Sequence, residues 1–186
     1  GNVCADGAAL GFESAAPGAF AERVHVPHAD YNCLPLPDGV EAVDVAALGC
    51  RFMTAYHALA HRTEPMPGSW IAVHGCGGVG LSALSVAAAT GHRTVAVDVR
   101  EEALGLAREV GADVTVNAGD EAVVDRVREI TGEGAHVSLD ALGRAETCRN
   151  SVRCVRPGGT HVQVVLTTDV PGEERLSGSG VSYCAT

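Results

Sequence analysis

From Trp70 onward, the chain alternates between short runs of β-branched apolar residues and longer stretches with helical patterning. The expected strands span residues 70–75, 94–98, 115–118, 136–142 and 160–166, and the expected helices span residues 81–90, 101–110, 121–131 and 144–155. Strict alternation of this kind is typical of parallel strands joined by crossover helices. It predicts an α/β fold with a doubly wound parallel sheet and right-handed crossovers.

The two ends of the chain do not follow this alternation. Residues 1–42 are rich in Gly and Pro, with one candidate strand at residues 19–27 and a turn at residues 35–39. We interpret residues 1–42 as the end of another domain and residues 43–168 as the α/β domain. A helical segment follows from Asp44 and carries Val45, Leu48, Phe52 and Leu59 on one face. Residues 169–186 lack clear periodicity and remain unassigned.

Charge and composition exclude several classes of protein. The formal net charge is −10, which opposes binding to nucleic acid, and all thirteen basic residues are Arg, which excludes mechanisms that need Lys. No run of about 18 apolar residues predicts a membrane span, and no secretory signal is visible. The seven cysteines contain no Cys-x-x-Cys pair, which indicates a reducing, cytoplasmic setting.

The stretch GCGGVG lies between the first expected strand and its helix. Its Gly75, Gly77 and Gly80 form the pattern G-x-G-x-x-G. In this context the first Gly permits a tight turn, the second a close approach of the backbone to a pyrophosphate, and the third close packing of helix on strand. The free N–H groups and positive dipole end of the helix would hold the diphosphate. The pattern therefore predicts a Rossmann-type dinucleotide site.

Asp98 closes the second expected strand, 18 residues beyond Gly80. Its carboxylate would accept hydrogen bonds from the adenosine ribose and repel the 2′-phosphate of NADP, so NAD is favoured. Arg100, two residues on, would soften that preference. Asp98 could instead serve only as a helix N-cap, and a methyltransferase reads adenosine with a similar loop and acidic residue.

Several stretches together resemble the zinc-dependent medium-chain alcohol dehydrogenases. These are GNVC at 1–4, GAFAERVHVP at 18–27, LPDG at 36–39, AALGCRFMTAYHAL at 46–59, VHGCGGVGLSA at 73–83, AVDV at 96–99, LDALG at 139–143 and RPGGTHVQV at 156–164. The resemblance implies a nicotinamide cofactor, hydride exchange with an alcohol or carbonyl substrate, and a zinc ion that polarises the substrate oxygen. It also implies that residues 1–42 end a GroES-like, β-rich catalytic domain.

The resemblance also assigns roles to single residues. Cys50 would be a ligand of the catalytic zinc, Cys4 a ligand of a structural zinc, and Thr54 would line the nicotinamide pocket. The remaining predicted cofactor contacts are the backbone N–H groups of Gly77, Gly78 and Val79 at the pyrophosphate, Leu142 beside the adenosine, and Val164 beside the nicotinamide ring. His57 and His61 are four apart on a helix, but we interpret them as an ordinary exposed pair.

The chain departs from this family in the ligands that it supplies. A catalytic zinc needs about three protein ligands, and only Cys50 matches one of them. We expect the chain to represent about half of a family member and to lack the amino-terminal part of the catalytic domain. Two hypotheses follow: a fragment of an NAD-linked, zinc-dependent alcohol dehydrogenase, or a dinucleotide-binding module without turnover. A homo-oligomer is compatible with both.

Overall fold

The computed structural model describes residues 10–11, 17–46 and 48–165. The described residues fall into two compact units, one ending at residue 46 and the other beginning at Leu48. Cys4 and the unassigned segment 169–186 lie outside the described residues. The GroES-like interpretation of residues 1–42 therefore stays a prediction.

The described residues of the first unit form two short helices, α1 (Ala29–Asn32) and α2 (Ala42–Ala46). No described side chain between residues 17 and 46 is buried. The predicted strand at residues 19–27 is wrong: these residues form no strand, and Phe20 and Val24 within them are exposed. The physical reason is that a strand is held by backbone hydrogen bonds to a neighbour, and no described strand pairs with this segment.

The second unit is a five-stranded sheet with helices in alternation. Its elements are η1 (Leu48–Phe52), α3 (Met53–Ala60), β1 (Trp70–His74), α4 (Gly78–Ala89), β2 (Arg93–Asp98), α5 (Glu101–Glu109), β3 (Val114–Asn117), α6 (Val123–Thr131), β4 (Ala135–Asp140), α7 (Ala145–Cys154) and β5 (Val155–Gln163). The strand order is β3-β2-β1-β4-β5, and every neighbouring pair is parallel. The predicted doubly wound parallel sheet is confirmed.

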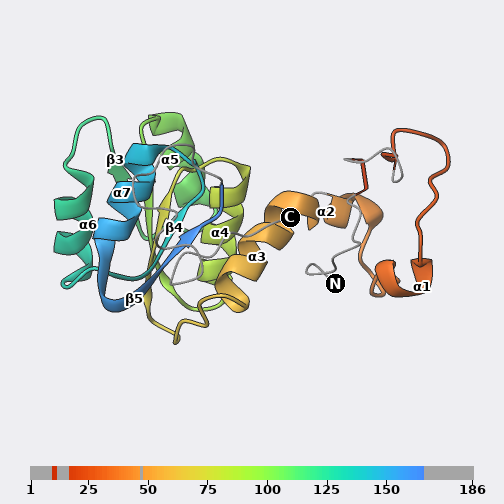
Figure 1. Cartoon of the computed structure of the whole chain (residues 1–186), viewed down its shortest axis with the longest axis horizontal. Coiled ribbons are helices and arrows are strands. Elements are labelled where there is room, and N and C mark those ends of the chain that lie inside the picture. The colour runs from red at the N-terminus through yellow and green to blue at the C-terminus, as the bar shows by residue number, and fades with distance from the viewer. Residues whose placement is uncertain (1–9, 12–16, 47, 166–186) are drawn as a thin grey trace. The chain divides into compact units, whose positions relative to one another are not determined.

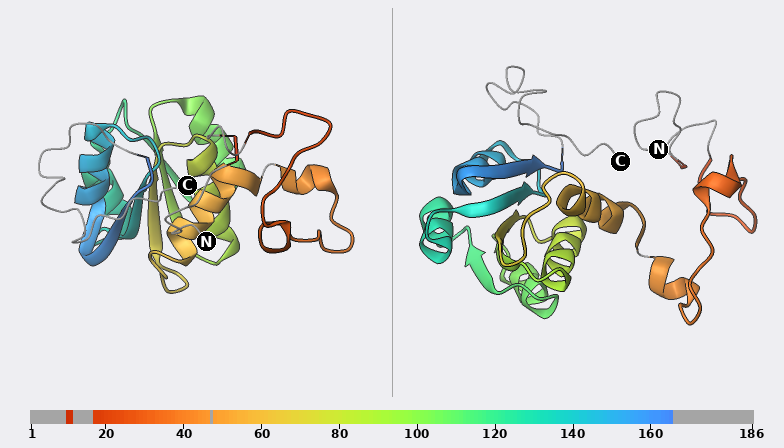
Figure 2. Two further views of the ribbon diagram at one scale, coloured as in Figure 1. Left: turned by 45° about the vertical axis from the view of Figure 1, so that its right-hand side comes forward. Right: turned by 90° about the horizontal axis from the view of Figure 1, so that it is seen from below.

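Helices cover both faces of this sheet (Figures 1 and 2). On one face, α3, α4 and α5 bury a core that includes Ile71, Val73 and Leu139. On the other, α6 and α7 cover a second core that includes Trp70, Val95 and Val116. All five residues of β1 are buried, as expected for the central strand of a parallel sheet.

Several element boundaries differ from the sequence prediction, and three of the differences have a structural reason. α4 begins at Gly78 rather than Leu81, since the Gly-rich residues already form its first turn. The predicted continuous helix from Asp44 is interrupted: η1 is a π-helical turn with non-helical backbone at Gly49. β5 begins at Val155 and contains Gly158. Its pairing with β4 passes from Ala135–Val155 to Val137–Thr160, so the residues of the expected turn form a bulge within β5.

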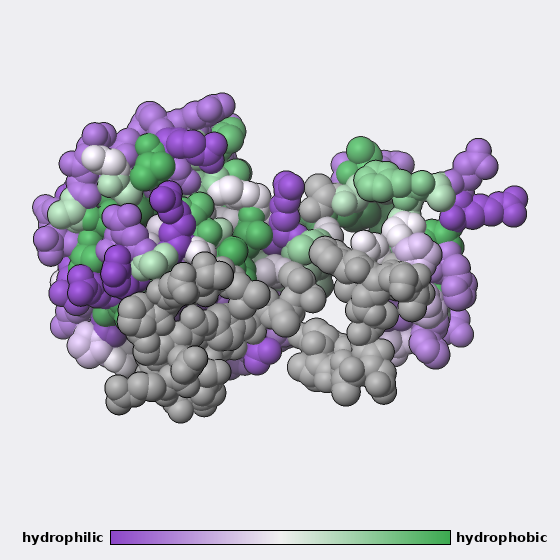
Figure 3. Space-filling model, turned by 45° about the horizontal axis from the view of Figure 1, so that its top comes forward, coloured by the Kyte–Doolittle hydropathy of each residue, from purple (hydrophilic) through white to green (hydrophobic). Residues whose placement is uncertain are grey.

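The visible surface of the second unit is largely hydrophilic, with scattered apolar residues (Figure 3). Such isolated apolar side chains are normal on a folded domain. Within the described ranges, no helix has both the length and the apolar character that a membrane crossing requires.

Candidate functional site

The glycine loop, Asp98 and Leu142 all lie at the carboxyl end of the sheet. β1 ends at His74, β2 at Asp98 and β4 at Asp140. His74 is paired in register with Asp140 on one side and, on the other, with the residue before Asp98. The chain turns from β1 to β2 on one side and reaches β4 on the other. In open α/β sheets, ligands bind in the crevice where the strand order reverses in this way.

The glycine loop has a geometry that only glycine permits at two positions. Gly75 has a φ of 94° and donates its N–H to the Val97 carbonyl at 2.8 Å. A β-carbon built on Gly80 would lie 1.8 Å from the Gly75 oxygen. The first and third glycines therefore let α4 pack directly on the turn that follows β1.

The second glycine is not required by packing. A β-carbon built on Gly77 would meet no heavy atom of the described residues within 4 Å. Gly77 is the N-cap of α4 and has extended backbone, with φ −83° and ψ −166°. The N–H groups of Gly78, Val79 and Gly80 lie in the first helical turn, where no intrahelical acceptor exists. The turn thus presents uncommitted donors beside open space, as an anion site requires.

The Asp98 carboxylate faces the glycine loop. Its Oδ2 accepts from the Cys76 N–H at 2.8 Å, and its Oδ1 accepts from the Arg100 N–H at 2.9 Å. The Arg100 Nε lies 3.6 Å from Oδ1, although this side chain is 64% exposed. The N-cap of α5 is Arg100, so Asp98 is not the N-cap. A carboxylate oxygen has two lone pairs, so each oxygen of Asp98 can accept from a further donor.

Cys76, between the first two glycines, is a core residue. It is 1% exposed and packs in the core beneath α4. Burial, with a further contribution from the Asp98 carboxylate, raises the pKa of its thiol to about 12. The thiol therefore stays protonated and unreactive at neutral pH.

Leu142 lies against the glycine loop. A β-carbon on Gly75 would be 3.1 Å from the Leu142 Cβ, and Leu142 is 45% exposed. Its N–H donates to Asp140 Oδ1 at 3.0 Å. Val164, which follows β5, donates its N–H to the Asp140 carbonyl at 3.0 Å and packs on the core. Both predicted cofactor contacts are thus fixed to the end of β4.

A buried polar chain behind this edge was not predicted from the sequence. Gln163 Nε2 donates to Asp140 Oδ2 at 2.9 Å and to the Val165 carbonyl at 2.7 Å, which leaves Gln163 Oε1 to accept from His161 Nε2 at 3.2 Å. His161 Nδ1 then accepts from Ser151, 2.9 Å away. Burial is the largest effect on His161 and lowers its pKa, so the imidazole ring is uncharged at neutral pH. These bonds hold the Asp140 carboxylate and the loop after it in one position.

His74 ends β1 on the same face of the sheet as Asp140, with which it is paired in register. The residue is 1% exposed, and its buried Nε2 has no hydrogen-bond partner among the described residues. Burial lowers the pKa of His74 to about 4, against an opposing effect of Asp140. No sequence signal marked this residue, because its neighbours in the fold are far along the chain.

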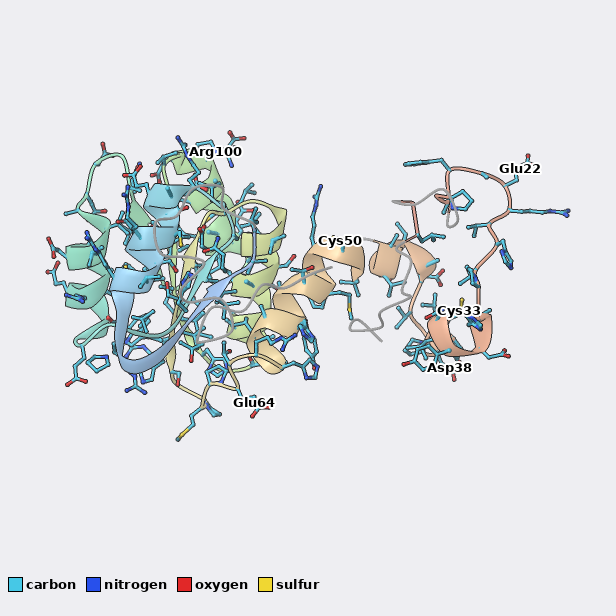
Figure 4. All side chains as sticks on the ribbon, in the orientation of Figure 1. Glu22, Cys33, Asp38, Cys50, Glu64 and Arg100 are labelled. Carbon is cyan, nitrogen blue, oxygen red and sulfur yellow. The ribbon has the colours of Figure 1, made fainter. Side chains whose placement is uncertain are left out.

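Cys50 and Thr54 lie in consecutive helical turns beside α4. Cys50 is exposed on η1, and Thr54 is buried in the first turn of α3. Figure 4 shows Cys50 at the end of this helical segment and Arg100 near the start of α5. Both η1 and α3 pack against α4, so Cys50 and Thr54 come to the helix that carries the glycine loop.

Comparison with known proteins identifies the family. The profile of the zinc-binding dehydrogenases matches residues 78–180, which is more than half of the chain. The chain belongs to this family.

Several relatives of this chain are named alcohol dehydrogenases. It is 36% identical over 155 residues to an alcohol dehydrogenase of Geobacillus stearothermophilus, covering 83% of the chain and 44% of the relative. It is 34% identical to an NAD-dependent alcohol dehydrogenase of Sulfurisphaera tokodaii, covering 80% and 43%. The chain thus spans less than half the length of these curated relatives.

Solved structures give the same assignment. The alcohol dehydrogenase TADH from Thermus sp. ATN1 superposes with a TM-score of 0.81 at 31% identity, covering 98% of this chain and 56% of that one. A mycobacterial protein complexed with NADPH superposes with a TM-score of 0.66 at 28% identity, covering 80% and 47%. The parallel sheet of this chain is therefore that of medium-chain alcohol dehydrogenases.

The described residues of this chain do not fit a zinc site. Across residues 10–11, 17–46 and 48–165, no three His, Cys, Asp or Glu side chains gather to hold a metal ion. His57 and His61 have ring centroids 5.3 Å apart, yet no third donor joins them in this part of the chain. Cys50 offers one thiol, whereas a catalytic zinc takes about three protein ligands. No chemical step through zinc follows from these residues.

Proposed function

We propose that this chain is the NAD-binding part of an alcohol dehydrogenase. The observation that carries the proposal is the pairing of the Asp98 carboxylate with the Cys76 N–H inside the glycine loop. It supports the proposal, because an acceptor for ribose hydroxyls would then lie next to helix N–H donors for a diphosphate. The adenosine ribose and the diphosphate of a dinucleotide would therefore be held by two adjacent elements of the fold.

The cofactor proposed is NAD rather than NADP. A 2′-phosphate on the adenosine ribose would meet the Asp98 carboxylate, and like charges at that range repel. Arg100 lies beside Asp98, but its guanidinium is mostly in solvent, where a surface ion pair contributes little. The carboxylate should therefore dominate the choice.

The chemistry proposed is hydride exchange between an alcohol and its carbonyl form. When bound, the nicotinamide supplies or accepts the hydride. Thr54 and Val164 are proposed to flank its ring, Leu142 the adenosine, and Gly77, Gly78 and Val79 the diphosphate. In the whole protein Cys50 is proposed to supply one zinc ligand, with the others from outside the described residues. We include in the same proposal a small alcohol or carbonyl substrate, a homo-oligomeric state and a cytoplasmic location.

A second proposal concerns the 186 residues by themselves. The described part contains the proposed contacts to the dinucleotide, but no three of its His, Cys, Asp or Glu side chains gather to hold a metal ion. We therefore propose that this chain alone binds the cofactor without oxidising alcohols. Zinc-dependent turnover by the chain alone would overturn this second proposal and leave the first intact.

Titration with NADH tests the first proposal. Binding should enhance nicotinamide fluorescence and saturate, and ADP-ribose should displace NADH because it carries the same adenosine and diphosphate. S-adenosylmethionine has no diphosphate and should not compete, which separates a dehydrogenase from a methyltransferase. The proposal fails if NADH does not saturate the chain or if S-adenosylmethionine displaces it.

A further inference from the structure

Arg51 lies over the first turn of α4. A β-carbon built on Gly78 would be 2.5 Å from Arg51 Cδ, 3.0 Å from Nε and 3.1 Å from Nη1. The guanidinium group is therefore beside the free N–H donors that follow Gly77. Arg51 lies in the stretch AALGCRFMTAYHAL, but the resemblance assigns it no role. Along the chain, α3 and β1 separate it from the glycine loop.

Two local features bring Arg51 to this place. The π-helical turn of η1, with non-helical backbone at Gly49, directs Arg51 toward α4, and such turns recur at functional sites. Gly78 has no β-carbon, so the stem of Arg51 rests directly on the helix. Any larger residue at position 78 would occupy the space that the arginine now fills.

The charge on Arg51 is not used elsewhere in the described part of the chain. The ion pairs recorded there do not include it, whereas Arg100 pairs with Asp98. Arg51 is exposed at the surface. In a chain with a formal net charge of −10, an available cation beside uncommitted N–H donors favours an anion. The planar guanidinium matches phosphate oxygens in particular.

We propose that Arg51 binds the diphosphate of the dinucleotide across the first turn of α4. The inference rests on the proposed NAD-binding function and assigns one further residue to it. Arg51 would act on the diphosphate, which NAD and NADP share, whereas Asp98 acts on the ribose, where the two differ. Loss of Arg51 should thus weaken the binding of NAD and NADP by the same factor, whereas loss of Asp98 should alter the ratio of their Kd values.

Titration of single variants of the 186-residue chain tests this role. Arg51→Gln should raise the Kd of NADH and of NADPH by the same factor, about three- to tenfold for one partly solvated charged hydrogen-bond pair. Arg62→Gln is the matched control, because it removes the same charge from an exposed residue just beyond the other end of α3. It should leave both Kd values within about twofold, since its charge is screened from the loop by distance and salt.

A double-mutant cycle with Gly78 tests the geometry. Gly78→Ala keeps the backbone N–H, but its β-carbon would displace Arg51, so it should also weaken NADH binding. In the Arg51→Gln background the same change should have no further effect, because the displaced group is already gone. Circular dichroism of each variant checks that the fold is retained.

The outcomes are distinguishable. Equal NADH affinities of Arg51→Gln and Arg62→Gln, or fully additive effects of the Gly78 and Arg51 changes, would overturn the role of Arg51 while leaving the proposed function in place. Absence of NADH binding by the unchanged chain would overturn the proposed function, and the role of Arg51 with it.

Discussion

Replacing Gly80 by Ala should destabilise this chain, although the same change usually stabilises a helix. Gly80 lies in the first turn of α4. The added β-carbon would lie 1.8 Å from the Gly75 oxygen and 2.9 Å from its carbonyl carbon. Both atoms belong to the backbone, so no side-chain rotation can relieve the overlap.

The expected magnitude follows from two opposing effects. Ordinary contact begins near 3.4 Å, so α4 would have to move away from Gly75 by more than 1 Å. Overpacking of this kind costs about 3 kcal/mol, and Ala in a helix returns up to about 1 kcal/mol relative to Gly. The free energy of unfolding should therefore fall by about 2 kcal/mol, which corresponds to a fall in Tm of roughly 4–8 °C for a chain of this size.

Gly105→Ala is the matched control. Gly105 lies inside α5, and a β-carbon there would meet no described heavy atom within 4 Å. This substitution should raise the free energy of unfolding by about 0.5–1 kcal/mol through helix propensity alone. Thermal and urea denaturation of both variants measure the difference. Equal shifts, or a stabilised Gly80→Ala variant, would refute the close packing of α4 on the turn.

Three further predictions concern titration, reactivity and cofactor choice. The pKa of His74 is about 4 in the folded chain and near 6.5 when unfolded, so acid should protonate the unfolded state first. Between pH 7 and pH 4.5, this should lower the free energy of unfolding by about 2–3 kcal/mol, and a His74→Phe variant should not show this loss. Urea titrations at each pH measure it, and parallel pH curves for the two proteins would contradict it. Iodoacetamide at pH 8 should alkylate the exposed Cys33 and Cys50 and spare Cys76, and mass spectrometry that finds Cys76 modified in the folded chain would argue against its burial. Asp98→Asn should weaken NADH binding about tenfold and NADPH binding less; an unchanged ratio of the two Kd values would show that this carboxylate does not read the ribose.

The sheet could be predicted because its signals are local. Apolar β-branched runs alternate with helical stretches. β1, β2 and β4 each consist mostly of buried residues, which makes each strand recognisable in the sequence. The glycine loop could be predicted for the same reason, since three glycines and one aspartate sit at fixed offsets between a strand and a helix. These elements need no knowledge of distant contacts.

The candidate strand at residues 19–27 was wrong because alternating apolar residues show only that a segment could pair. Pairing also requires a neighbouring strand, and the described residues offer none to this segment. The start of α4 was placed three residues late, since glycine has low helix propensity and hides a first turn that tertiary packing stabilises.

The long-range parts of the site could not be predicted. Arg51 reaches the glycine loop only through the irregular turn at Gly49, which no periodicity reveals. Likewise, Gln163, His161 and Ser151 meet because α7 folds back over β5, and single polar residues in strands give no sequence signal for a shared hydrogen-bond chain.

The most direct test of the central claim is to locate the bound dinucleotide with backbone amide NMR spectra. If the glycine loop and Asp98 hold the cofactor, ADP-ribose should shift the amide signals of Gly77, Gly78 and Asp98 in a saturable way. A cavity of about 450 Å³ at the opposite, amino edge of the sheet, lined in part by Met66 and His136, provides the internal comparison. Saturable shifts confined to that cavity, with the glycine-loop signals unmoved, would contradict the account.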